Sequence, residues 1–230
     1  MQIGGFQKTS LLDYPDKISA IVWTVGCNFK CPFCYNLQLV KKSAECIDEN
    51  EILSFLKKRK GLLEGISISG GEPLLQKDIE DFIIKIKKLD YLVKIDTNGA
   101  FPDLLEKLIE EKLVDYVAMD VKAPKDKYHK LSGVKTDIDK IEKSIKIIND
   151  KAADYEFKTT FVPGLLEKED IIKIAKWLKG SSKYYLQQFK TDVPLISNKL
   201  EKAVPYSKEY LYETLEAIKP YFKNCSLRGV

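Results

Sequence analysis

Three cysteines stand within eight positions of the chain, at Cys27, Cys31 and Cys34 in the stretch GCNFKCPFCYN. A structural zinc site takes four protein ligands, and an ordinary cubane iron–sulfur cluster also takes four thiolates. A disulfide framework uses an even number of cysteines. Three neighbouring thiolates therefore indicate a metal centre with one coordination position left open for a small molecule.

Two other interpretations of these cysteines stay open at this point. Buried cysteine often acts as a small hydrophobic residue, although Cys-x3-Cys-x2-Cys directly after a predicted strand is typical of a loop. The cysteines could also bind zinc, with Cys46 or the single histidine, His129, as the fourth ligand. Cys46 follows Cys34 at no familiar zinc spacing, which favours an iron–sulfur cluster with an open iron.

Further polar residues follow other predicted strands. The stretch SGGEP, residues 69–73, has two interpretations: it forms a simple turn, or the carboxylate of Glu72 binds an ammonium group. Asp96 and Asp120 end two adjacent strands, where they act as caps, as a cation site or as paired hydrogen-bond acceptors. Lys122 lies on the same strand face as Asp120 and either forms a structural salt bridge or binds a carboxylate.

The elements that must position these residues alternate strictly between strand and helix. Predicted strands cover residues 18–25, 65–69, 93–96, 114–121, 155–162 and 183–189. Predicted helices cover residues 49–60, 76–89, 102–112, 137–150, 167–180 and 207–222. This α/β pattern predicts an open parallel sheet with helices outside, and six units are too few for an eight-fold barrel. We therefore expect a partial (β/α)6 TIM-like barrel.

The two ends of the chain lie outside the alternating strands and helices. Residues 1–17 are expected to form an N-terminal arm or hairpin, and CSLRGV at 225–230 a final short strand. We treat residues 1–230 as a single domain. Active sites of parallel α/β folds form at the carboxyl ends of the strands, and the polar, Gly and Pro residues of this chain gather at those ends.

Composition excludes several classes of protein. The chain has 230 residues, 44% of them hydrophobic, with a net charge of +4 spread along its length. No basic–aromatic run indicates a nucleic-acid partner. The N-terminus lacks a signal pattern, and no apolar run approaches the roughly 20 residues of a membrane span. We expect a cytoplasmic protein with reduced thiols and no membrane partner.

Cys-x3-Cys-x2-Cys followed by Gly-Gly-Glu-Pro resembles the radical S-adenosylmethionine (SAM) enzymes. Within them the chain resembles the glycyl-radical-enzyme activating enzymes, in particular the anaerobic ribonucleoside-triphosphate reductase activating proteins. The supporting stretches are GFQKTSLLDYP (5–15), IDTNG (95–99), DYVAMDVKAP (115–124), EFKTTFVPGLLEKED (156–170) and LQQF (186–189). The resemblance extends over nearly the whole chain.

The resemblance implies one [4Fe–4S] cluster, bound by Cys27, Cys31 and Cys34, whose fourth iron takes the amino and carboxylate groups of SAM. It also implies a set of cofactor-binding residues. The methionine amino group would be bound by Gly70, Gly71, Glu72 and Pro73. A monovalent cation and the cofactor would lie near Asp96, Thr97 and Asp120. Lys122 would contact the cofactor, and Tyr35 would pack near the adenine.

This sequence departs from related ones in two places. Tyr35 stands where histidine is frequent, and it keeps the aromatic ring. Residues 187–189 read Gln-Gln-Phe where some activating enzymes contact the cofactor through a histidine, so that role is not carried over. No cysteine-rich insertion follows Cys34, so we expect a single cluster and structural roles for Cys46 and Cys225.

The implied activity is reductive cleavage of SAM at the cluster, followed by removal of a hydrogen atom from a glycine of a partner glycyl-radical enzyme. That partner would be anaerobic ribonucleotide reductase, and a flavodoxin- or ferredoxin-like protein would donate the electron. No catalytic side chain is expected beyond the cluster and cofactor. Two alternatives stay open: a radical SAM enzyme acting on a small molecule or nucleobase, and a zinc or electron-transfer protein without catalysis.

Overall fold

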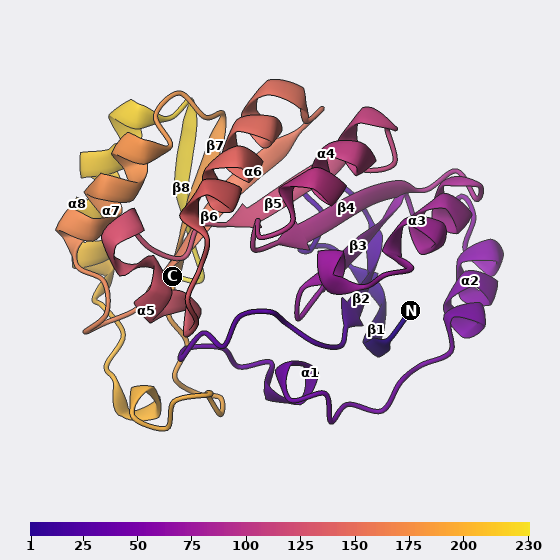
Figure 1. Ribbon diagram of the computed structural model, residues 1–230, viewed down its shortest axis with the longest axis horizontal. Coiled ribbons are helices and arrows are strands. Elements are labelled where there is room, and N and C mark those ends of the chain that lie inside the picture. The colour runs from indigo at the N-terminus through magenta and orange to yellow at the C-terminus, as the bar shows by residue number, and fades with distance from the viewer.

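The strands of the sheet lie side by side in the same order as they follow in the chain (Figure 1). The computed structural model describes all 230 residues. The strands are β1 (Ile3–Ser10), β2 (Ser19–Thr24), β3 (Gly65–Gly70), β4 (Leu92–Thr97), β5 (Tyr116–Asp120), β6 (Tyr155–Phe161), β7 (Lys183–Gln188) and β8 (Asn224–Arg228). Neighbouring strands from β2 to β8 are parallel, and β1 pairs antiparallel with β2.

Six helices follow strands β2 to β7, as the sequence predicted. These are α2 (Glu49–Lys58), α3 (Ile79–Lys87), α4 (Pro102–Glu110), α6 (Ile138–Lys151), α7 (Lys168–Trp177) and α8 (Lys208–Ile218). Two short helices, α1 (Leu37–Val40) and α5 (Tyr128–Ser132), were not predicted because a single turn shows no helical periodicity. Short 3₁₀ turns occupy Pro73–Leu75, Lys125–Lys127, Leu200–Lys202 and Lys219–Tyr221.

The two faces of β4 differ in chemistry. Along β4, Val93 and Ile95 are fully buried in the hydrophobic core that the helices share, whereas the alternate residues Lys94 and Asp96 point into the barrel. Successive side chains of a strand point to opposite faces, so one face packs on helices and the other lines the interior. The barrel interior therefore carries the charged groups of the site.

The sheet does not close on itself, because β1 and β8 are its two edges. Figure 1 shows these strands toward opposite sides of the molecule. The predicted open, partial (β/α)6 barrel is thus confirmed, with β8 as the predicted final strand. No helix combines the length and the apolar character that a membrane crossing requires.

Candidate active site

The loop over residues 26–36 carries the three cysteines away from the end of β2. It has no regular structure, so its backbone polar groups need partners elsewhere. The amide of Lys30 donates to the carbonyl of Ser132 at the end of α5, at 2.8 Å. Gly133 makes this approach possible, because a Cβ atom there would lie 2.1 Å from the carbonyl oxygen of Lys30. Helix α5 thereby holds one side of the loop.

A second segment holds the other side of the cysteine loop. Residues 190–206, here called the strap, connect β7 to α8. The amide of Ile196 donates to the carbonyl of Cys34 at 3.0 Å, and the amide of Ser197 donates to the carbonyl of Pro32 at 2.9 Å. The backbone around the third cysteine is therefore fixed by a segment more than 160 positions later in the chain.

The three cysteines are present as free thiols. None forms a disulfide; Cys31 is buried, and Cys27 and Cys34 are half-buried. Burial raises the pKa of Cys27 to about 12 and that of Cys31 to about 11, so both thiols keep their protons at neutral pH. A metal must displace these protons when it binds.

The structure supplies no fourth protein ligand for a zinc ion at the three cysteines. No three His, Cys, Asp or Glu side chains converge on one point, as the ligands of a zinc ion would. A cubane cluster binds each cysteine through a different iron atom, so its cysteines are spread around it. Cys46 is exposed, Cys225 lies in β8, and neither they nor His129 lines the cavity that the three cysteines share.

The turn after β3 packs against the start of the cysteine loop. A Cβ atom at Gly70, whose φ is +124°, would lie 2.2 Å from the amide nitrogen of Thr24. A Cβ atom at Gly71 would lie 2.0 Å from the carbonyl oxygen of Gly26. The amide of Glu72 donates to that same oxygen at 2.9 Å. Both glycines are thus required by close backbone approach, which places the predicted SAM-binding turn beside the predicted cluster loop.

The carboxylate of Glu72 points into the protein. It accepts hydrogen bonds from the Leu74 amide at 3.1 Å, the Thr97 hydroxyl at 2.9 Å and the Asn98 amide at 2.7 Å. Only 1% of the residue is exposed, and this burial raises the pKa of Glu72 to about 7 against the lowering effect of the three donors. Glu72 thus ties the turn after β3 to the end of β4, while Pro73 begins the adjoining 3₁₀ turn.

Asn98 connects this unit to a cysteine. Its side-chain amide donates to the side chain of Asn28 at 2.8 Å and lies 4.0 Å from Cys27 Sγ. The amide of Phe29 donates to the same sulfur at 3.3 Å. Hydrogen bonds to cysteine sulfur tune the reduction potential of an iron–sulfur cluster, so Asn98 is a site residue that the sequence reasoning missed.

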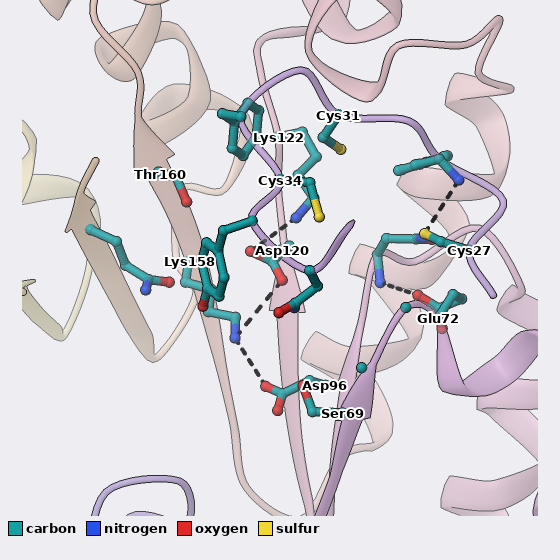
Figure 2. Close-up of a pocket in the computed structure, with 18 of the residues that line it drawn as sticks. Cys27, Cys31, Cys34, Ser69, Glu72, Asp96, Asp120, Lys122, Lys158 and Thr160 are labelled. Carbon is teal, nitrogen blue, oxygen red and sulfur yellow. Dashed lines mark hydrogen bonds and ion pairs between the residues drawn. The ribbon is translucent and has the colours of Figure 1, made fainter. Parts of the chain in front are cut away.

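Charged side chains fill the centre of the barrel mouth (Figure 2). Asp120 ends β5 as predicted, and Asp96 lies one residue before the end of the adjacent strand β4. Lys122 Nζ lies 3.2 Å from Asp120 Oδ1. Lys158 of β6, which was not predicted, reaches between the aspartates, with Nζ 2.9 Å from Asp96 Oδ1 and 3.8 Å from Asp120 Oδ2. Lys94 Nζ also lies 2.9 Å from Asp96 Oδ1.

These groups hold each other in their charged forms. Burial alone would raise the pKa of Asp96, but the ammonium groups of Lys158 and Lys94 hold it well below its usual range. Burial alone would lower the pKa of Lys158 and of Lys122, yet the neighbouring aspartates raise both above the ordinary value for lysine. Asp96, Lys122 and Lys158 are therefore ionised at neutral pH.

All of the predicted site residues except Pro73 line one cavity of about 260 Å³. A single water needs roughly 10–15 Å³, so the cavity is large enough for a small molecule. Tyr35, 57% exposed, stands at its rim. Polar lining residues that had no predicted role include Asn98, Lys158, Thr160, Gln187, Gln188, Lys190 and Arg228. The cysteines, the turn and the aspartates thus face one space.

Known proteins share this sequence and fold. The sequence profile of the Radical SAM superfamily matches residues 21–178. A Methanocaldococcus jannaschii protein, MJ1227, provisionally named a glycyl-radical enzyme activating enzyme, is 37% identical over 236 residues, which cover 99% of this chain and 96% of that protein. The pyruvate formate-lyase-activating enzyme of Staphylococcus epidermidis is 30% identical over 176 residues, or 70% of this chain and 68% of that enzyme.

Solved structures agree at the level of the fold. Streptococcus suis SuiB bound to S-adenosylmethionine superposes with a TM-score of 0.69 at 20% identity, over 88% of this chain and 48% of SuiB. This chain spans about half the length of SuiB. A domain of pyruvate-formate lyase-activating enzyme from Bacteroides vulgatus superposes with a TM-score of 0.56 at 16% identity, over 72% of this chain and 99% of that domain. The chain belongs to the radical SAM superfamily and, within it, to the glycyl-radical enzyme activating enzymes.

Proposed function

We propose that this protein activates anaerobic ribonucleotide reductase by removing a hydrogen atom from one glycine of that enzyme. The contact between the cysteine loop and the Gly70–Glu72 turn at the rim of one charged cavity supports the radical chemistry, and the choice of partner rests on the resemblance of residues 5–15, 95–99, 115–124 and 156–170. That contact places three free cysteine thiols beside the backbone of the turn and near the ammonium groups of Lys122 and Lys158.

The residues present fit the cofactors of the family. Cys27, Cys31 and Cys34 would hold a [4Fe–4S] cluster and leave its fourth iron without a protein ligand. When bound there, the cluster and SAM supply an electron and a 5′-deoxyadenosyl group for hydrogen-atom removal. The turn with Gly70 and Gly71 would meet the amino group of SAM.

The chain's own side chains would orient the cofactor. Lys122 and Lys158 bring positive charge to the cavity, which favours a ligand carboxylate at that position. The hydroxyl of Thr97 is held by Glu72, and Asp96 and Asp120 fix the lysines. Tyr35 offers an exposed ring for an adenine to stack on. These contacts position a charged ligand before any reaction begins.

A partner loop needs a way into the cavity. The sheet is open between β1 and β8, and the cavity lining extends to Arg228 and Gly229 at the β8 edge. We propose that the glycine-bearing loop enters through this opening. The reaction would take place in the cytoplasm under anaerobic conditions, with a flavodoxin- or ferredoxin-like donor supplying the electron.

The test mixes anaerobically reconstituted protein, reductant and SAM with the anaerobic ribonucleotide reductase of the same organism. Electron paramagnetic resonance should show a glycyl-radical doublet. Cys31→Ala should abolish the doublet, whereas Cys225→Ala, which lies outside the cavity, should retain it.

Other outcomes point elsewhere. Free 5′-deoxyadenosine without a doublet would favour another glycyl-radical enzyme or a small-molecule or nucleobase substrate. Neither signal, from protein with a complete cluster, would overturn the activating role.

A further inference from the structure

Lys158 occupies the position at which two neighbouring aspartates would hold a cation. It is the register partner of Asp120 on the adjacent parallel strand, so the two side chains point to the same face. Asp96 pairs with Ala118, two residues before Asp120, and therefore also faces the interior. Figure 2 shows the Lys158 ammonium joined to both carboxylates.

Three of the four carboxylate oxygens of Asp96 and Asp120 already face ammonium groups. Asp96 Oδ1 faces two ammonium groups, those of Lys94 and Lys158, each at 2.9 Å. Asp120 faces Lys122 through Oδ1 and Lys158 through Oδ2. A metal ion that used any of these three oxygens as a ligand would have to displace an ammonium group or lie beside it, and the two carry charge of the same sign.

The charge balance points the same way. Three ammonium groups, from Lys94, Lys122 and Lys158, face the two carboxylates of Asp96 and Asp120, which leaves one positive charge in excess. Another cation would increase that excess, whereas a ligand carboxylate would neutralise it. The site is therefore arranged for an anionic group.

The same arrangement recurs deeper in the barrel. Glu156 is only 1% exposed. Its carboxylate accepts hydrogen bonds from the two terminal nitrogens of the Arg228 guanidinium, at 2.5 and 2.7 Å, and from the hydroxyl of Tyr116 at 2.8 Å. Arg228 is also stacked on the ring of Tyr185 at 3.5 Å from its centroid. Each of these interior carboxylates is thus paired with a side-chain cation.

We propose that the ammonium of Lys158 is the resident cation of this site, and that the protein binds its cofactor without a monovalent metal ion. The predicted monovalent cation does not fit the residues present. A tethered ammonium cannot dissociate, so the charge beside the cofactor is independent of sodium or potassium concentration. Only the identity of the ligand, SAM, rests on the proposed function.

The first test uses the cluster-free full chain and needs no SAM. Unfolding midpoints are compared in sodium, potassium and choline chloride at equal ionic strength, and sodium binding is followed by the line width of ²³Na resonance. Wild type should show equal midpoints in the three salts and no broadening beyond that of the variant Asp96→Asn, which lacks one of the two carboxylates that a metal ion would need. Stabilisation or broadening specific to the wild type would overturn the proposal.

The variant Lys158→Met should create the missing cation site. It keeps the length of the side chain and leaves Asp96 and Asp120 without their bridging charge, so sodium or potassium should now raise the midpoint and broaden the ²³Na signal. A folded Lys158→Met protein whose unfolding midpoint and ²³Na line width do not respond to sodium or potassium would overturn the proposal. If this variant does not fold, the wild-type comparison still decides the question.

The second test measures SAM binding to the reconstituted protein by calorimetry in the same three salts. The wild-type Kd should stay constant, within roughly twofold, and Lys158→Met should bind about tenfold more weakly in choline, with recovery in potassium or sodium. A wild-type Kd that tightens about tenfold with either ion would contradict the proposal. If SAM binds in no salt, the proposed function fails while the cluster-free test of Lys158 stands.

Discussion

Gly71 lies so close to Gly26 that a Cβ atom on Gly71 would stand 2.0 Å from the carbonyl oxygen of Gly26. Gly26 directly precedes the first cysteine, and the Glu72 amide donates to the same carbonyl. The turn after β3 and the loop after β2 therefore form one packed unit. A displacement of the turn must move the cysteine loop as well.

Gly71→Ala should disrupt this unit. The added methyl group meets backbone, which cannot rotate away, so we expect a loss of about 1–3 kcal/mol in the free energy of unfolding and a large loss of bound iron after reconstitution. Gly164→Ala is the control, because its Cβ would point into open space and only its φ of +73° is strained. Full iron content and unchanged SAM affinity in Gly71→Ala would show that the two segments are not coupled.

Glu72 should make stability depend on pH. Its pKa rises from 4.5 in the unfolded chain to about 7 in the fold, so between these values only the folded chain keeps the proton. The free energy of unfolding should then fall as pH rises across this window. Urea unfolding of cluster-free protein measures this slope, and Glu72→Gln should lack that part of it. An identical slope in wild type and variant would refute this prediction.

Asn98 should influence the reduction of the cluster. Asn98→Ala removes the side-chain amide that lies 4.0 Å from Cys27 Sγ, and loss of a donor near a cluster sulfur makes the reduced state less favourable. We expect a more negative midpoint potential in an anaerobic redox titration followed by electron paramagnetic resonance. Asn50→Ala, remote on α2, should match the wild type, and equal potentials in all three proteins would exclude the role of Asn98.

The strap should protect the cluster from loss of iron. Ser197→Pro removes the amide that donates to the carbonyl of Pro32, whereas Ser197→Ala keeps it. We expect a chelator to remove iron faster from Ser197→Pro than from Ser197→Ala or wild type. Equal rates in the two variants would mean that the strap does not hold the cysteine loop.

Much of the fold and the identity of the cofactor-binding motifs could be predicted from the sequence. Strands and helices can be predicted from the local periodicity of apolar residues, and the spacing of Cys27, Cys31 and Cys34 can be read from one short stretch of sequence. The position of parallel strand ends then brings Gly71, Asp96 and neighbouring residues to one edge. The short helices, the 3₁₀ turns and the exact ends of strands and helices departed from expectation, since terminal residues depend on tertiary contacts.

Contacts between distant segments were harder to predict. Lys158 sits in YEFKTTF, where alternation of apolar and polar residues marks an interior face, but its aspartate partners lie on other strands. The inward direction of the Glu72 carboxylate depends on donors after β4. The strap has no periodic pattern, and its role depends on backbone hydrogen bonds to Pro32 and Cys34 that no side-chain pattern encodes.

The most direct test of the proposed activity follows the hydrogen atom itself. Anaerobic ribonucleotide reductase would be prepared with deuterated glycine and mixed with the reconstituted protein, reductant and SAM, and the 5′-deoxyadenosine formed would be analysed by mass spectrometry. The proposed function predicts 5′-deoxyadenosine that carries one deuterium, formed together with the glycyl radical. Unlabelled 5′-deoxyadenosine from a reaction with fully labelled partner would contradict it.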